Sequence, residues 1–330
     1  MVSAKIIQNG ATRQRERRIA VAMLLLTNAA WGVSFPVMKA LGETQKLALP
    51  QSSPLFRASS TMTARFLIAA VLMAAFLSKR LRGLTARDAQ LGVGLGIFAG
   101  LGTALQFVGL EYTLASTSAF LTQLSVLLIP IVTAIWIRRL PTWRVWASCA
   151  LVMIGMGILC QVDWLNIQLG RGEWLTLTSA FCFTGQIIWL GRPTFRDCDK
   201  LRATLIMLIT IAVMFLPITL VTGTVGDAIV ANSSTAAIVM LVVLALICSV
   251  IAFGVMNTYQ PKITPTQAGV VYCFEPIFAS FYALFMPAWL AVLAGIAYAN
   301  ESVTFHLLVG GALITAANVL IQFEQKKERQ

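Results

Sequence analysis

Long apolar runs recur along nearly the whole chain, and they constrain its fold more than any other feature. Short polar stretches separate these runs, and each run has the length of about 20 residues that a helix needs to cross a bilayer. With 58% hydrophobic and only 12% charged residues, the chain carries too little charge to cover a soluble domain. A transmembrane barrel would instead show alternating segments of about ten residues. The sequence therefore predicts an all-α, polytopic membrane protein.

Ten spans are expected, joined by short loops that leave no room for a soluble domain. The lipid-embedded helices must then carry the function. Their approximate ranges are 19–38, 58–77, 91–110, 114–137, 144–161, 173–191, 203–222, 236–257, 266–286 and 305–323.

The basic residues are distributed unevenly between the two predicted sides of the membrane. One side holds 20 of the 25 Lys and Arg residues, in both terminal tails and in alternate loops, and the other side holds 5. Cytoplasmic loops carry such an excess, so we expect both termini in the cytoplasm of a bacterial inner (plasma) membrane protein. The net charge of +12 then reflects topology, and no nucleic-acid partner is expected. The first apolar run is interpreted as a retained helix and not as a signal peptide.

The segment 288–299, "AWLAVLAGIAYA", does not fit this count, because it is apolar but only 12 residues long. That length is too short to span, and a further span would place the basic C-terminal tail outside. We interpret it as an interfacial or re-entrant helix after the ninth span, with Pro287 causing the break. Its role is not predicted.

Two parts of the chain resemble each other. "LPTWRVWASCALVMIGMGIL" aligns with "SVTFHLLVGGALITAANVLI", with Thr142 over Thr304, and the fourth and ninth spans each carry a proline, Pro130 and Pro276. Two halves of five helices each would run in opposite directions through the membrane. The expected organisation is a basic tail (1–18), a first repeat (19–161), a second repeat (173–323) and a C-terminal tail (324–330).

Several segments together resemble the EamA-type branch of the drug/metabolite transporter superfamily. They are "AAWGVSFPVMK", "ARFLIAA", "GLEYTLASTSAFLTQLSVLLIPIVTAIWIRRLP", "CFEPIFASFYALF" and "LLVGGALITAANVLIQF". The resemblance implies ten helices in two inverted five-helix repeats around a central cavity. Members often carry "GE" after the proline-containing helix. Glu301 fits that place in the second half, but the first half has "RRLP".

The first span contains the sequence "NAAWGVSFPVMKAL", which is unusual for a helix in lipid. Pro36 frees a backbone carbonyl one turn earlier, and Trp31 lies about 18 Å from the cytoplasmic end by helical rise, too deep for the aromatic belt. Asn28 is deeper than an unpartnered amide should be. We favour a bendable helix in which Asn28, Trp31 and Ser34 line a polar cavity. The alternative is a packing kink with Asn28 bonded to a neighbouring helix.

Glu275 is the only carboxylate deep within a span, roughly 14 Å into the ninth helix by helical rise. A charge at this depth costs about 2.5–3.5 kcal/mol or more. Two interpretations have equal weight: a site that couples transport to protons or binds an ammonium group, and a structural acid beside Pro276. Arg65 lies near the outer end of the second span, so we expect it to snorkel to the interface. An ion pair with Glu275 is the alternative.

Other polar groups within spans are candidates to line the cavity as a set, although each alone is better explained as a contact between helices. They are Gln106, Thr122, Gln123, Gln186 and Tyr272. Gly92, Gly96 and Gly100 have the spacing of a close helix contact. His306 is the only histidine, and Thr304 is expected to cap its helix. No metal, cofactor or disulfide framework is expected.

The favoured function is a secondary transporter that moves a small metabolite, amino acid-like or amphipathic compound by alternating access, with export as the favoured direction. The alternative is a membrane scaffold or an intramembrane enzyme. Enzymes in membranes usually cluster His, Asp or Ser–His groups, whereas this chain has one His and one deep carboxylate, so no enzyme is expected. The expected partners are a small-molecule substrate and the lipid bilayer, and a homo-oligomer is left open.

Overall fold

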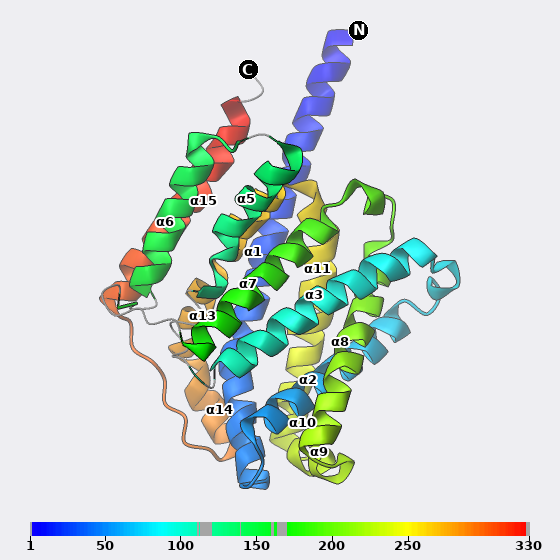
Figure 1. Ribbon diagram of the computed structural model, residues 1–330, viewed down its shortest axis with the longest axis vertical. Coiled ribbons are helices and arrows are strands. Elements are labelled where there is room, and N and C mark those ends of the chain that lie inside the picture. Colours follow the sequence, from blue (N-terminus) through cyan, green and yellow to red (C-terminus); the bar gives the residue numbers. More distant parts are fainter. Residues whose placement is uncertain are drawn as a thin grey trace.

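The computed structural model shows a bundle of helices (Figure 1). It describes residues 2–110, 112, 121–138, 140–159, 162–163 and 170–327, and every regular element in those ranges is a helix, as predicted. The elements are α1 (Val2–Ala48), α2 (Pro54–Phe76), η1 (Leu81–Gly83), α3 (Ala86–Leu110), α5 (Ser125–Ile137), α6 (Trp143–Leu159), α7 (Arg171–Leu190), η2 (Pro193–Phe195), α8 (Lys200–Thr222), α9 (Val225–Asn232), α10 (Thr235–Ala245), η3 (Leu246–Ile251), α11 (Ala252–Tyr259), η4 (Gln260–Lys262), α12 (Pro265–Tyr272), α13 (Glu275–Ala283), α14 (Met286–Ala294) and α15 (Phe305–Lys327). Part of the predicted fourth span and the end of the fifth lie outside the described residues.

Within the described residues, five helical stretches are long and apolar enough to cross a membrane. They lie in α1, α2, α3, α8 and the continuous stretch from α10 to η4. A sixth results if α12–α13 and α14, which are bent by 60° relative to each other, count as one span. Shorter apolar helices lie in α5, α6 and α15. The polytopic helical class is therefore confirmed, while the number of ten spans stays a prediction.

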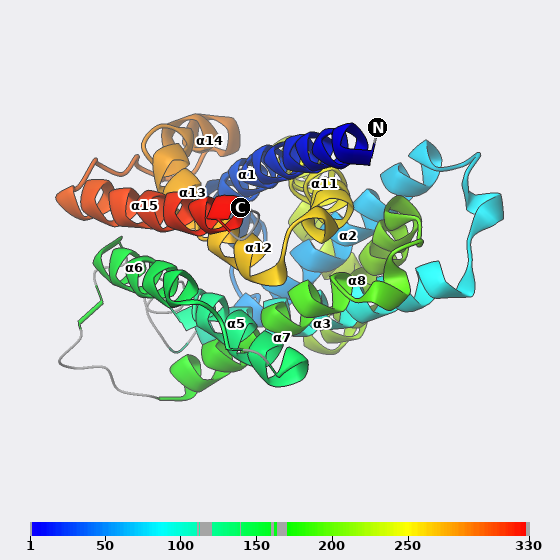
Figure 2. The same ribbon diagram turned by 90° about the horizontal axis from the view of Figure 1, so that it is seen from above.

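The helix α12 lies near the centre of the bundle, where it contacts α1, α5, α7 and α15 (Figure 2). Around it, α3 packs against both α7 and α8, α1 packs against α10, α11 and α13, and α2 packs against α8. The helices α6 and α15 form a pair along one edge of the bundle (Figure 2). This arrangement places one face of α1 and one face of α12 in the interior of the bundle.

Glycines on two faces allow α3 to approach both of its neighbours closely. A Cβ on Gly92 or Gly96 would lie 2.5 Å from atoms of α8, and one on Gly100 would lie 2.9 Å from a sulfur atom of α8. Gly94 and Gly102 instead face aromatic rings of α7. Small residues permit such contacts in membrane proteins, so the close helix contact predicted from the Gly92 spacing is confirmed, with α8 as the partner.

The helix α1 is continuous through Pro36, so this proline does not interrupt it. A Cβ on Gly32 would lie 2.7 Å from Phe278 Cβ, so the glycine lets α1 approach α13 closely. Pro276 occupies the first turn of α13, where the missing N–H has no intrahelical partner to lose. Pro130 lies inside α5.

Residues 288–294 of the short apolar segment lie in α14, a separate helix that begins at Met286 after α13; an interfacial or re-entrant place in the membrane stays a prediction. The base of α14 is closed by two hydrogen bonds, from the Glu301 N–H to the Ala283 carbonyl and from the Ala288 N–H to Asn300 Oδ1, both 2.9 Å. Leu290 is buried in a cluster formed with α1 and α10. In the following loop, burial and, to a lesser extent, the charge of Glu301 raise the pKa of Tyr298 to about 12.

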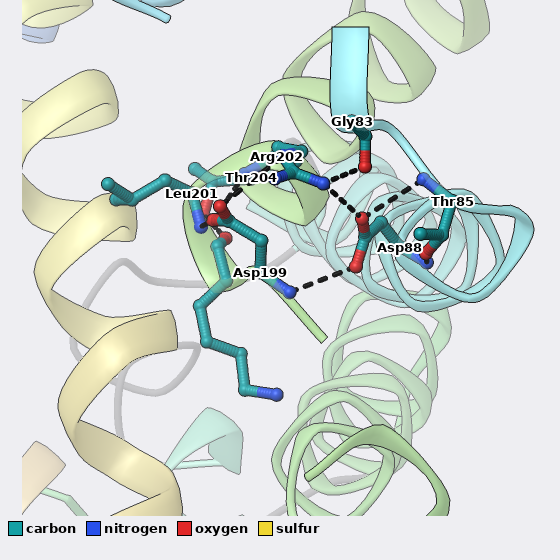
Figure 3. A network of polar contacts seen from close by, with 8 residues as sticks. Gly83, Thr85, Asp88, Asp199, Leu201, Arg202 and Thr204 are labelled. Atoms are coloured by element: carbon teal, nitrogen blue, oxygen red, sulfur yellow. Dashed lines mark hydrogen bonds and ion pairs between the residues drawn. The ribbon is translucent and has the colours of Figure 1, made fainter. Parts of the chain in front are cut away.

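A network of polar contacts joins the loop before α3 to the start of α8 (Figure 3). Asp88, which is buried, accepts hydrogen bonds from the backbone N–H groups of Thr85 at 3.1 Å and Asp199 at 2.9 Å. It also pairs with Arg202 at 3.3 Å, and Arg202 donates to the Gly83 carbonyl. Asp199 caps the N-terminus of α8. The network thus holds the loop before α3 against the start of α8, away from the polar interior of the bundle.

The contact between α6 and α15 provides a stability test. A Cβ on Gly310 would lie 2.6 Å from the Gly155 carbonyl oxygen and 2.9 Å from the Leu159 nitrogen, whereas one on Gly311 would meet only Ile277 at 3.8 Å or more. We expect Gly310→Ala to destabilise the protein by about 1–3 kcal/mol, because backbone atoms cannot yield. The measurement is thermal unfolding in detergent, with Gly311→Ala as the control. Equal melting temperatures for both variants would contradict the close packing.

Candidate functional site

The candidate site lies where α1, α2, η3 and the break between α12 and α13 meet. Trp31 contacts the rings of Phe253 and Tyr272, at centroid distances of 5.4 and 5.7 Å, and Phe253 lies 6.2 Å from Phe66. These rings come from α1, α11, α12 and α2. They form an aromatic wall beside the polar groups of the interior.

Asn28 is fully buried in α1 and joins it to α12. Its Nδ2 donates to the Leu24 carbonyl at 2.9 Å and to the Val271 carbonyl at 3.0 Å. This is the bond to a neighbouring helix that the sequence analysis gave as the alternative to a cavity. Its Oδ1 has no hydrogen-bond partner among the described residues, and an orphaned buried acceptor costs about 1–3 kcal/mol. Asn28 therefore has both a packing role and an unused acceptor.

Glu275 is the first residue of α13, directly after a break in the helix at residues 273–274. Its carboxylate forms no hydrogen bond or ion pair within the described part of the chain, and the residue is partly exposed. It nevertheless lies close enough to interact through charge with Arg65 of α2. Arg65 is buried, so the carboxylate lies beside the interior of the bundle. The N-terminus of a helix also favours a negative charge at this position.

Arg65 does not snorkel, and that expectation is wrong. Because α2 begins at Pro54, four residues earlier than predicted, Arg65 lies about 16 Å along the helix, and it is only 6% exposed. Its Nε donates to Ser249 Oγ at 2.8 Å and its Nη2 to the Cys248 carbonyl at 3.2 Å. Within the described residues it forms no direct ion pair with Glu275.

The acceptors of Arg65 belong to the π-helix η3, which the sequence analysis missed. Ser249 Oγ also donates to the Leu244 carbonyl, and Cys248 Sγ donates to the Ala30 carbonyl of α1, both at 3.0 Å. A π-helical turn disturbs the regular backbone ladder and is frequent at functional sites. Ser249 was the only available signal, as the one hydroxyl in the apolar run of the eighth span.

A second group of predicted residues lies around a helix break at residues 123–124, just before α5. This break resembles the one at residues 273–274 before α13. Gln106 Nε2 donates to Thr122 Oγ1 at 3.1 Å, which joins α3 to the segment that precedes α5. Cys273 Sγ donates to Gln123 Oε1 at 3.4 Å. Residues 123–124 and 273–274 are both turns between helical segments, so the two breaks touch each other in the interior.

The remaining candidates do not join these groups through their polar atoms. The Tyr272 hydroxyl donates to Gln260 Oε1 at 2.7 Å, although its ring faces Trp31. The Ser34 hydroxyl donates to the Trp31 carbonyl within α1 at 2.6 Å. Gln186 is buried, and its amide forms no hydrogen bond with the described residues. The structure thus places Asn28 and Trp31 against α12 and Glu275 just after its end, whereas the Ser34 and Tyr272 hydroxyls donate to other groups.

The described residues contain no group of three or more His, Cys, Asp or Glu side chains placed to hold a metal ion. Thr304 Oγ1 accepts from the Leu307 N–H at 3.2 Å and caps α15, as predicted. The interior offers a carboxylate, a guanidinium, an unused amide oxygen and aromatic rings. These groups suit non-covalent binding of a small molecule.

Comparison with known proteins agrees with this geometry. Residues 18–160 match the EamA-like transporter family. An uncharacterized transporter from Archaeoglobus fulgidus is 27% identical over 279 residues, which cover 84% of this chain and 82% of the relative. A solved crystal structure shares the fold, with a TM-score of 0.70 and 15% identity, and the match covers 95% of this chain and 100% of the other. On this evidence, the first part of the chain is similar to the EamA-like transporter family, and its apolar helices make the chain a multi-pass membrane protein.

Proposed function

We propose that the protein is a secondary transporter that moves a small metabolite, amino acid-like or amphipathic compound by alternating access, with export as its direction. The observation that carries the proposal is the carboxylate of Glu275, which lies at a break in the ninth span and forms no ion pair with any described residue. Intramembrane acids mark substrate or proton pathways by default, and broken helices form binding sites in transporters.

Two inverted five-helix repeats, 19–161 and 173–323, are part of this proposal, and the helix packing supports them. If α1, α2, α3 and α5 correspond to α7, α8, α10–α11 and α13, then three contacts of the described helices have counterparts. The contact of α3 with α7 corresponds to that of α11 with α1, and α5 with α7 corresponds to α13 with α1. The contact of α3 with α8 corresponds to that of α10 with α2.

The spacing of the helix starts supports the same correspondence. Glu275 follows Ser125 by 150 residues, whereas Phe305 follows Trp143 by 162 residues. The difference of 12 residues equals the length of the segment 288–299. That segment is thus an insertion into the second repeat.

The proposed orientation places both termini in the cytoplasm and the protein in the plasma membrane. The beginning of α1 and the end of α15 lie at the same end of the bundle (Figure 1), which fits an even number of spans. The excess of basic residues on this side favours the cytoplasm.

In the proposed cycle, Glu275 takes up and releases a proton, or holds a cationic group, as the site opens to either side. Arg65 supplies the opposite charge in the interior, held in place by Ser249 and the Cys248 carbonyl. Since the two charges interact without a direct bond, either can pair with a substrate group without first breaking a salt bridge. No observation favours the scaffold or the enzyme.

Water access to the site is the first prediction. Trp31 is partly exposed whereas Asn28 is fully buried, so Cys at position 31 should react with a water-soluble thiol reagent faster than Cys at position 28. Bound substrate should slow the reaction at 31. The assay uses a variant without the six native cysteines, with mass-spectrometric detection of labelling. Absence of labelling at 31, while a loop position reacts, would contradict an aqueous path to Trp31.

The role of Glu275 is tested with Glu275→Gln, which keeps the shape but cannot carry charge. If Glu275 couples transport to protons, uptake into liposomes driven by a pH gradient should fall by about tenfold or more, because an essential proton carrier is lost. Substrate binding, measured by thermal shift, and folding should persist. Glu301→Gln, in the exposed loop after α14, is the control.

Gradient-driven uptake by Glu275→Gln with unchanged rate and pH dependence would contradict the coupling role. Glu275 would then be a structural acid beside Pro276.

A further inference from the structure

A cluster of basic and aromatic side chains lies away from the interior site, at the end of the bundle where α1 begins. The Arg192 cluster consists of Trp136, Arg138, Trp189, Arg192, Tyr259 and Lys262. These residues lie at the ends of α5, α7 and α11–η4. The helices are neighbours, since α7 packs against both α5 and α12. A Cβ on Gly191, the residue before Arg192, would lie 3.5 Å from Pro265, which starts α12 just after Lys262.

Arg192 lies between two indole rings that belong to different helices. Its guanidinium carbon is 5.1 Å from the ring centroid of Trp136 and 4.7 Å from that of Trp189. Lys262 lies over Tyr259 in the same way, at 4.6 Å. Stacking on a ring face holds a guanidinium in place and leaves the N–H groups at its edge free to bind an anion.

The platform under Arg192 is rigid. Trp189 Nε1 donates to the Leu91 carbonyl at 3.3 Å, and its ring packs against Phe195 at 5.0 Å. Gly94 of α3 leaves the space that this indole occupies. Arg192 is therefore positioned before any ligand arrives, which lowers the entropic cost of binding.

Within the described residues, the positive charges of the cluster have no acidic partner. Arg138, Arg192 and Lys262 form no ion pair or hydrogen bond through their side chains with any residue that the structure describes. Arg138 ends α5 with φ of 54°, the left-handed region that non-glycine residues rarely adopt. This conformation turns the chain at the exposed rim of the cluster, where Trp136 is 57% exposed.

The place of these residues at the end of the bundle indicates which kind of anion the cluster would bind. They lie where apolar helices end, and exposed tryptophans at this position belong to the headgroup level of a bilayer. Basic pockets between helices at this level bind lipid phosphates, and a guanidinium matches phosphate geometry. We propose that Arg192, held between Trp136 and Trp189 and assisted by Arg138 and Lys262, binds the phosphate headgroup of an anionic phospholipid.

The test compares lipid retention by the full-length protein in native mass spectrometry. The probes are phosphatidylglycerol and phosphatidylcholine, titrated separately. Arg192→Gln should weaken phosphatidylglycerol binding by about fivefold, the effect of one basic residue near a membrane surface, and leave phosphatidylcholine unchanged. Arg171→Gln is the matched control, because it removes the same charge from the opposite end of α7.

A second variant separates the platform from the charge. Trp136→Leu keeps all three cations and alters an exposed side chain, so it should fold normally and still weaken phosphatidylglycerol binding. Equal losses for Arg171→Gln and Arg192→Gln, or equal retention of both lipids, would overturn the proposal. So would displacement of the bound lipid by inorganic phosphate at an equal concentration, which would indicate a general anion site.

Discussion

The close approach of α3 to α7 and α8 is the contact on which the rest of the bundle depends. Lipid tails are as apolar as leucine side chains, so helices in a bilayer gain little from burying apolar surface and associate through tight packing instead. Glycines on one face of α3 let the α8 backbone approach closely, and glycines on another face leave room for aromatic rings of α7. With α7 and α8 held in this way, α12 lies at the centre of the bundle. The helix breaks at residues 123–124 and 273–274 meet there. The interior polar groups are thus placed by contacts that themselves contain no charge.

Within that frame, the interior is built from groups that are only partly satisfied. Arg65 is anchored by the widened turn of η3, and Asn28 is anchored by α12, yet Asn28 Oδ1 and the carboxylate of Glu275 have no hydrogen-bond partner in the described chain. Unsatisfied groups of this kind are expensive in a low-dielectric interior. Their concentration around one break, beside aromatic rings, is what distinguishes a binding region from ordinary contacts between helices.

Much of the fold could be predicted from the sequence, because apolar length, glycine spacing and helix caps are local signals. The Gly92–Gly96–Gly100 contact, the cap at Thr304 and the break before α14 are examples. Arg65 was placed too near the membrane surface, because its depth depends on where α2 begins and the cap at Ser53 with Pro54 was not recognised as that start. The π-helix was also missed, because no residue in its apolar run predicts such a turn, whereas its contact with Arg65 joins segments far apart in the sequence. Nor does the sequence reveal that the Ser34 and Tyr272 hydroxyls already have acceptors.

In the proposed organisation of two repeats, the helix α14 makes the two halves of the chain unequal. It is closed at its base by the bond from Glu301 to Ala283, and it contacts α1 and α10, whereas the corresponding place in the first half is the short connection between α5 and α6. Perfectly equal inverted halves would give inward-open and outward-open conformations of the same energy. In the proposed transport cycle, an extra helix attached to one half would contribute different contacts in each conformation, so their populations at rest need not be equal even without a gradient.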